Sequence, residues 1–173
     1  MEEIKYAGNF IKVTEELIEG RVWERVYLTD GVEIFPINTE GKIALIEERR
    51  PHEINKTRLK FVTGLMDGQE DPIVCANREM QEEIGWKADH LEILTHRVSS
   101  GTVNNNFYQV IATHLSVSKI PNPDGEDTII SIKFYAIEEI EQLLEEGKLS
   151  WSMGALGIYK IKSLIKTNKL IFN

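Results

Sequence analysis

Residues 64–86 read GLMDGQEDPIVCANREMQEEIGW, and this stretch, called the box below, decides the central helix of the fold. Asp71 followed by Pro72 predicts the helix start, because aspartate caps free backbone N–H groups and proline is tolerated in the first turn. Apolar residues then recur at helical spacing, at Ile73, Ala76, Met80 and Ile84. Gly85 fits the left-handed conformation in which many helices end. We expect one helix from Pro72 to Gly85, with its apolar side buried.

Opposite the apolar side lie three glutamates, Glu79, Glu82 and Glu83. Positions i, i+3 and i+4 share one side of an α-helix, so these carboxylates repel one another unless a cation lies among them. One interpretation is a solvated acidic surface, the common meaning of a glutamate-rich helix. The other is a site for a divalent metal. Oxygen ligands on a rigid helix favour magnesium or manganese over zinc.

The flanking residues favour the metal site. The stretch fits the pattern G-x5-E-x7-R-E-U-x-E-E-x-G-U, where U is a bulky apolar residue. The fixed positions are Gly64, Glu70, Arg78, Glu79, Glu82, Glu83 and Gly85, with Met80 and Trp86 at the apolar ones. Such a match arises by chance in about one chain in 10⁵ of this length. From about Val13 to Ile165 the chain therefore resembles the Nudix hydrolases, with Trp86 in place of the usual aliphatic residue.

The resemblance implies the α/β class and an α/β/α sandwich with a mixed central sheet, in which the box helix carries the metal site. The family hydrolyses a nucleoside diphosphate linked to another group, with Mg²⁺ as cofactor and Mn²⁺ as a substitute. The implied metal ligands are Glu79, Glu83, Glu82 and the backbone carbonyl of Gly64. Arg78 and Glu70 are implied to hold the ligand carboxylates in place. Glu82 is also an alternative proton acceptor.

By resemblance, the residues that flank the box narrow the range of expected substrates. Ile46 to Pro51 precede the box at the spacing seen in ADP-ribose and nucleotide-sugar pyrophosphatases, where an arginine contacts the substrate phosphates. Arg49 and Arg50 are the candidates, and we favour Arg50; the alternative is that both are solvent-facing charges. The subfamily usually has Glu-Leu-Pro-Ala where this chain has Lys60 to Thr63, so both ADP-ribose and other nucleoside diphosphate sugars stay open.

The acidic loop from Pro121 to Asp127 offers a catalytic base. Similar hydrolases place a glutamate there, and Glu126 matches it best; the alternative is a solvated acidic turn. Trp23, Tyr27 and Phe107 are candidates to stack on a nucleobase, with core or interface packing as the alternative.

Composition bounds the remaining possibilities. The chain has 173 residues, a net charge of −8 and one cysteine, which fits a single domain over 1–173 without disulfides. Excess negative charge argues against nucleic acid or an anionic membrane as partner. It also means that bound cations must reverse the local field before an anionic pyrophosphate can approach. We find no signal core or membrane-spanning run and expect a cytoplasmic protein.

Secondary structure outside the box follows from alternation and from helical spacing. We expect strands at 10–13, 21–28, 32–35, 43–46, 60–62, 90–97, 107–114 and 129–135, and helices at 137–146 and 153–165. By resemblance, the strands within residues 1–35 serve a homodimer.

Two other functions share parts of this pattern. A hydrolase of nucleoside triphosphates or dinucleoside polyphosphates has the same box and differs only in its flanks. A non-catalytic regulator that binds a nucleotide sugar keeps the fold, but usually adds a DNA-binding module.

Overall fold

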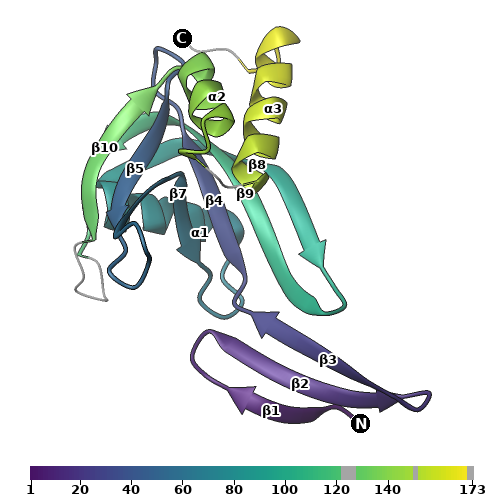
Figure 1. Ribbon diagram of the computed structural model, residues 1–173. Coiled ribbons are helices and arrows are strands. Elements are labelled where there is room, and N and C mark those ends of the chain that lie inside the picture. Colours follow the sequence, from purple (N-terminus) through teal and green to yellow (C-terminus); the bar gives the residue numbers. More distant parts are fainter. Residues whose placement is uncertain (122–127, 150–151, 171–173) are drawn as a thin grey trace.

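A computed structural model of the chain describes residues 1–121, 128–149 and 152–170 (Figure 1). The strands there are β1 Glu3–Ala7, β2 Ile11–Ile18, β3 Arg21–Leu28, β4 Gly31–Pro36, β5 Ile43–Arg49, β6 Thr57–Lys60, β7 Val62–Leu65, β8 Trp86–Ser99, β9 Val103–Val117 and β10 Ile129–Tyr135. The helices are α1 Pro72–Glu79, the π-helical turn η1 Met80–Ile84, α2 Ile137–Glu145 and α3 Ser152–Lys166. None of the helices in these residues is long and apolar enough to cross a membrane.

The central sheet is mixed, as expected. Strand β4 pairs with β9 in parallel and with β7 in antiparallel orientation, and β8 and β9 form a long antiparallel hairpin. A second, antiparallel sheet has the order β10-β5-β6. Every residue of β4 is buried, which is typical of a strand covered on both faces.

Alternate residues of β4 contribute to two cores. Val32 and Ile34 belong to a cluster with residues of α1 and η1, including Met80. Phe35 belongs to the other cluster, with Ile140, Leu149, Ile158 and Ile161 from the C-terminal region. The sheet therefore lies between the box helix and the pair α2–α3, which confirms the predicted sandwich. Truncating a fully buried residue such as Met80 to alanine costs about 2–5 kcal/mol.

The box helix begins and ends where the sequence predicts. Asp71 accepts hydrogen bonds from the backbone N–H groups of Ile73 and Val74, and Pro72 occupies the first turn. Gly85 ends the helix with a φ of 72°. The prediction of one regular α-helix was wrong, however, because α1 stops at Glu79 and η1 continues as a wider turn. A π-turn inserts an extra residue per turn, so the side chains that follow Glu79 are rotated away from α-helical register.

The predicted strand at 60–62 is two strands in different sheets. Lys60 pairs with Ile46 of β5, whereas Val62 pairs with Ile34 of β4. Phe61 lies between them and is buried against Phe35, with ring centroids 4.9 Å apart. The chain therefore changes sheets at Phe61, directly before the box.

Strands β1, β2 and β3 form an antiparallel unit, called the N-terminal sheet below, that extends away from the sandwich (Figure 1). Two register pairs, Val26 with Val103 and Tyr27 with Asn104, join it to β9. Its large exposed apolar side chains are Ile4, Tyr6, Phe10, Ile11, Leu17, Ile18, Val22, Trp23 and Leu28. The sequence prediction missed β1 altogether.

Candidate active site

Arg78 gathers three carboxylates of the box. Its Nε and Nη2 donate to the two oxygens of Glu70 at 3.1 and 2.9 Å. Its Nη1 donates to Glu79 at 2.8 Å and to Glu82 at 2.9 Å. Its Nη2 also reaches the carbonyl of Leu65 at 3.0 Å. Hydrogen bonds from Arg78 hold the pKa of Glu70 below its usual range. In turn, the contacts with Glu70 and Glu79 raise the pKa of Arg78.

Gly64 lies directly against Glu79. Gly64 pairs with Val32 across β7 and β4, and a Cβ at position 64 would collide with the carboxyl group of Glu79. Only glycine therefore lets the backbone of β7 approach this carboxylate so closely. The resemblance implies that the Gly64 carbonyl and Glu79 both bind metal, and this stays a prediction; the structure shows that the two residues lie in contact.

Glu83 lies apart from the Arg78 network. Its side chain is only 14% exposed, and its Oε2 has no hydrogen-bond partner among the described residues. Burial raises the pKa of Glu83 to about 7, against the opposing effects of Lys60 and a backbone hydrogen bond from Thr63. Burial also raises the pKa of Glu79 to about 7, against the opposing effect of Arg78. For both Glu79 and Glu83, the neighbouring positive charge is too small to offset the effect of burial on the pKa.

These features fit a divalent cation, since a buried carboxylate with an unpartnered oxygen is stabilised by a bound ion. Within the described part of the chain, no three acidic, histidine or cysteine side chains are already gathered around a common point. Two cationic side chains approach these carboxylates, with Arg78 between Glu79 and Glu82 and Lys60 next to Glu83.

Lys60, which sequence reasoning named only as a departure from the subfamily, is part of the site. Its Nζ lies 3.1 Å from Glu48, 3.8 Å from Glu83 and 3.0 Å from the Thr63 hydroxyl. Arg50 approaches the same Glu48 oxygen, with its Nε at 2.9 Å. Both contacts to Glu48 have ion-pair distances but not hydrogen-bond angles, so the attraction is electrostatic.

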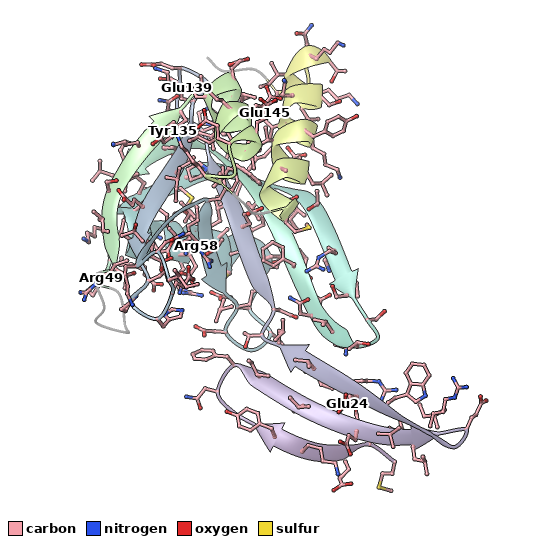
Figure 2. The ribbon with its side chains drawn as sticks, in the orientation of Figure 1. Glu24, Arg49, Arg58, Tyr135, Glu139 and Glu145 are labelled. Carbon is pink, nitrogen blue, oxygen red and sulfur yellow. The ribbon has the colours of Figure 1, made fainter. Side chains whose placement is uncertain are left out.

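The two candidate arginines differ in their surroundings. Arg50 is half-buried and held by Glu48, whereas Arg49 is exposed. Figure 2 shows Arg49 at the margin of the molecule. Arg50 is therefore the better placed of the two to act with the box. Glu126, the predicted base, lies outside the described residues, as do Asp124 and Asp127.

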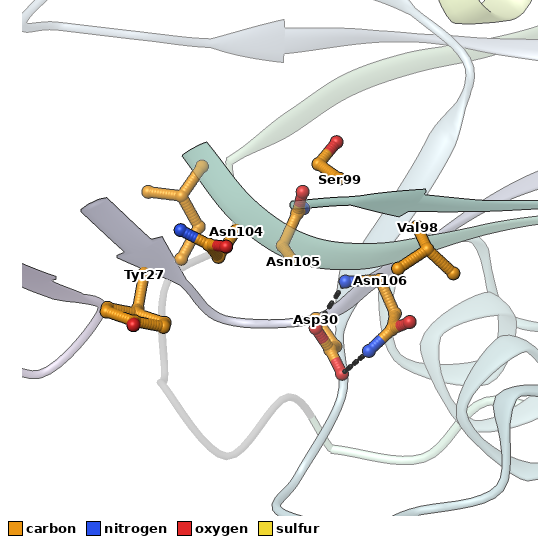
Figure 3. Close-up of a pocket in the computed structure, with 8 residues that line it drawn as sticks. Tyr27, Asp30, Val98, Ser99, Asn104, Asn105 and Asn106 are labelled. Carbon is orange, nitrogen blue, oxygen red and sulfur yellow. Dashed lines mark hydrogen bonds between the residues drawn. The ribbon is translucent and has the colours of Figure 1, made fainter. Parts of the chain in front are cut away.

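A cavity of about 230 Å³ lies between the N-terminal sheet and the sandwich (Figure 3). It is lined by Tyr27, Leu28, Asp30, Val98, Ser99, Asn104, Asn105 and Asn106. Asp30 accepts hydrogen bonds from the backbone and side-chain amides of Asn106 at 2.6 and 2.9 Å. The Asp30 carbonyl accepts a hydrogen bond from the backbone N–H of Met66, so one of the lining residues is bonded to the box. Of the three aromatic candidates, Tyr27 lines this cavity, whereas Trp23 and Phe107 do not.

Comparisons with known proteins agree with this geometry. The model of the NUDIX domain family matches residues 28–153. The chain is 25% identical over 151 residues to a methanol dehydrogenase activator of Bacillus methanolicus, covering 83% of this chain and 80% of the relative. It is 28% identical over 134 residues to an ADP-ribose pyrophosphatase of Bacillus subtilis (strain 168), covering 75% and 71%.

A solved structure described as an ADP compounds hydrolase is similar in fold. It superimposes with a TM-score of 0.81 at 21% identity, covering 97% of this chain and 93% of that one. At this level of identity the likeness concerns the fold, including the N-terminal sheet.

Proposed function

Because the chain belongs to the NUDIX domain family, we propose that it hydrolyses the pyrophosphate bond of ADP-ribose or another nucleoside diphosphate sugar. Water would add across one P–O–P bond, and the products would be a nucleoside monophosphate and a sugar phosphate. The observation that carries the proposal is the arrangement of the box around Arg78, with Gly64 against Glu79 and with Glu83, largely buried, on the turn that follows Glu79. The similarity to an ADP-ribose pyrophosphatase supports this substrate class.

Mg²⁺, with Mn²⁺ as a substitute, would be held by Glu79, Glu82, Glu83 and the carbonyl of Gly64. Such an ion, when bound, neutralises charge on phosphate oxygens and lowers the pKa of a coordinated water. Arg78 and Glu70 would keep Glu79 and Glu82 in position, because Arg78 contacts all three carboxylates.

The remaining steps belong to side chains around the box. Arg50 would bind the substrate diphosphate, since a guanidinium forms bidentate contacts to phosphate oxygens. Glu126 would take the proton of the attacking water, with Glu82 as the alternative acceptor. The cavity at Tyr27 and Asn104–Asn106 would receive a sugar or base, because amide side chains and a phenol offer both donors and acceptors.

A substrate screen tests the proposal. Purified protein is incubated with ADP-ribose, other nucleoside diphosphate sugars, nucleoside triphosphates and dinucleoside polyphosphates, each with Mg²⁺ or Mn²⁺, and the products are separated by chromatography. We expect monophosphate release to be fastest from ADP-ribose or a nucleotide sugar. Faster turnover of triphosphates or dinucleoside polyphosphates would favour that alternative, and binding without turnover would favour a regulator.

Glu83→Gln on the best substrate is the matched test of the site. It removes a charge with little change in shape, and we expect turnover to fall by about 10³-fold. Glu145→Gln is the control, because Glu145 is exposed on α2, on the opposite face of the sheet (Figure 2). Equal turnover in both variants would contradict the proposed site.

We also propose that the chain forms a homodimer through the N-terminal sheet. The support is the concentration of exposed apolar side chains on β1, β2 and β3, which a second copy would cover. Residues 1–35 would then serve assembly within a single domain over 1–173. A cytoplasmic location, and the absence of nucleic acid and membrane partners, stay predictions from the sequence.

A further inference from the structure

Lys60 is a lysine in an unusual environment. The residue is 8% exposed, and lysine is rarely buried to this extent unless it is paired with an anion. It ends β6, immediately before the chain changes sheets at Phe61. Its ammonium group therefore lies inside the molecule, between strand β5 and the end of the box helix.

Two buried carboxylates share this ammonium group. Glu48, which is 6% exposed, lies 3.1 Å from the Lys60 Nζ, and Glu83 lies 3.8 Å from it. The Thr63 hydroxyl accepts a hydrogen bond from the same nitrogen at 3.0 Å. Lys60 thus connects Glu83 at the end of the box with Glu48, which in turn contacts Arg50.

The four glutamates of the box are divided between two cationic side chains. Arg78 contacts Glu70, Glu79 and Glu82, and Lys60 contacts Glu83. Arg78 contacts Glu79 and Glu82 from within the box itself. Lys60 approaches from a different sheet and contacts the carboxylate whose Oε2 has no partner in the described residues.

We propose that Lys60 is an internal counter-cation that positions Glu83 and Glu48 in the metal-free protein and opposes the binding of a divalent cation at the box. It would thereby set the Mg²⁺ concentration at which the site fills. The inference rests on the proposed function, because it assumes that Glu83 is a metal ligand.

The physical reason is the distance dependence of charge interactions in a partly buried site. An ammonium group close to a ligand carboxylate stabilises that carboxylate without metal and repels an incoming divalent ion. Removing the ammonium charge takes away the cation that lies next to Glu83 and leaves Glu48 with Arg50 as its one ion-pair partner among the described residues. The metal-free protein therefore loses stability while its affinity for a cation increases. A lysine that only paired with Glu48 would change the stability and leave the affinity unaltered.

The experiment compares Mg²⁺ binding by isothermal titration calorimetry, without substrate, in the wild-type protein, Lys60→Met and Lys60→Arg. We expect Lys60→Met to bind Mg²⁺ roughly tenfold more tightly, and Lys60→Arg to bind like the wild type. Lys42→Met is the matched control, because Lys42 is an exposed lysine paired with Glu40 in a distant turn. It carries the same charge change and should leave the affinity unchanged.

Thermal unfolding gives a second readout. In chelator, Lys60→Met should have a lower midpoint than the wild type, and Mg²⁺ should raise it by more than it raises that of the wild type. Lys60→Gln keeps a hydrogen-bond donor for Thr63, so it replaces Lys60→Met in both measurements should that variant fail to fold, with the same expected direction.

Unchanged or weaker Mg²⁺ affinity in the neutral variants, with normal binding and turnover in the wild type, would overturn the inference and leave the proposed function intact. Absence of Mg²⁺ binding and of turnover in the wild type would overturn the proposed function, and the inference with it. Tighter binding in Lys42→Met as well would also overturn the inference, because the effect would then follow net charge.

Discussion

The box and the N-terminal sheet differ in how far their side chains are paired or buried within one chain. In the box, Arg78 is bonded to Glu70, Glu79 and Glu82, and the apolar side of the helix is buried within the same chain. In the N-terminal sheet, apolar side chains such as Leu17 and Val22 are exposed, and two register pairs join the sheet to the sandwich. The charged side chains of the box are mostly paired within one chain, with Glu83 Oε2 as the exception among the described residues. The N-terminal sheet instead leaves apolar side chains exposed, and the proposed homodimer would cover them.

Of the changes considered, removal of the Arg78 side chain should disturb the box most. Arg78→Ala leaves Glu79 and Glu82, whose side chains are 13% and 9% exposed, without their counter-charge. We expect turnover to fall by about 10³-fold and the free energy of unfolding to fall by about 2–4 kcal/mol. Activity assays and urea titrations measure both effects. Arg58→Ala, which removes a more exposed arginine paired with Glu53, is the control. Wild-type turnover in Arg78→Ala would contradict the proposed role of Arg78, which is to hold Glu79 and Glu82 in position.

A methyl group should break the closest contact of the box. Gly64→Ala places a Cβ where the Glu79 carboxyl group lies, so either the strand or the carboxylate must move. We expect turnover to fall by about 10²-fold and stability by about 1–3 kcal/mol. Gly147→Ala is a useful comparison because nothing lies within 4 Å of its Cβ position, so its effect should be confined to backbone strain at a φ of 67°. An active, stable Gly64→Ala variant would contradict the close-approach argument.

Introducing a charge on the N-terminal sheet should weaken the proposed dimer without changing the stability of the single chain. Leu17→Asp alters a side chain that is 67% exposed in one chain, so the stability of that chain should change by less than about 0.5 kcal/mol. If a second copy covers this surface, the dimer should dissociate at least tenfold more readily, as measured by light scattering over a concentration series. Val117→Asp, at an 80% exposed valine on β9, should leave assembly unchanged. Identical masses for wild type and Leu17→Asp would count against the proposed interface.

A buried carboxylate outside the box extends the comparison, because it has no counter-cation within the part of the chain that the structure describes. Glu33 on β4 is fully buried; Gln109 Nε2 donates to it at 2.7 Å, and its Oε1 has no partner among the described residues. Burial raises the pKa of Glu33 to about 7. The folded state therefore holds this proton to higher pH than the unfolded state, and the free energy of unfolding falls as pH rises from about 4.5 to 7.

Glu33→Gln should abolish this part of the pH dependence. Relative to the wild type, the variant should gain about 2 kcal/mol of stability between pH 5 and pH 8. Denaturant titrations of both proteins at the two pH values measure the difference, and the shared titration of Glu79 and Glu83 cancels in the comparison. A constant difference across this range would mean that Glu33 titrates normally.

How far the sequence predicts the structure depends on whether a feature is set locally. Asp71, Pro72 and Gly85 act within a few residues of themselves, and both ends of the box helix were predicted correctly. The spacing of Arg78 to Glu82 and Glu79 is also local, so their proximity followed from helical geometry. The sequence predicted β3 with its observed bounds, Arg21–Leu28, whereas it predicted only residues 107–114 of the longer strand β9, Val103–Val117.

Features set by distant contacts were not predicted. The π-turn from Met80 to Ile84 was not predicted, because such turns are rare and the apolar spacing of this stretch is that of an ordinary α-helix. The pairing of Lys60 with Glu48 and Glu83 joins three elements, and no spacing rule links them. Strand β1 is short and exposed, so it lacks the buried alternation on which strand prediction depends.

The two-pair junction between β3 and β9 has an evolutionary consequence. Since two register pairs tie the N-terminal sheet to the sandwich, we expect sequence changes in that sheet to leave the box undisturbed. Tyr27 belongs to this junction and also lines the cavity beside the box. If the N-terminal sheet forms the proposed dimer and this cavity receives the proposed ligand, changes at this junction would alter ligand preference and quaternary arrangement together, without altering the box.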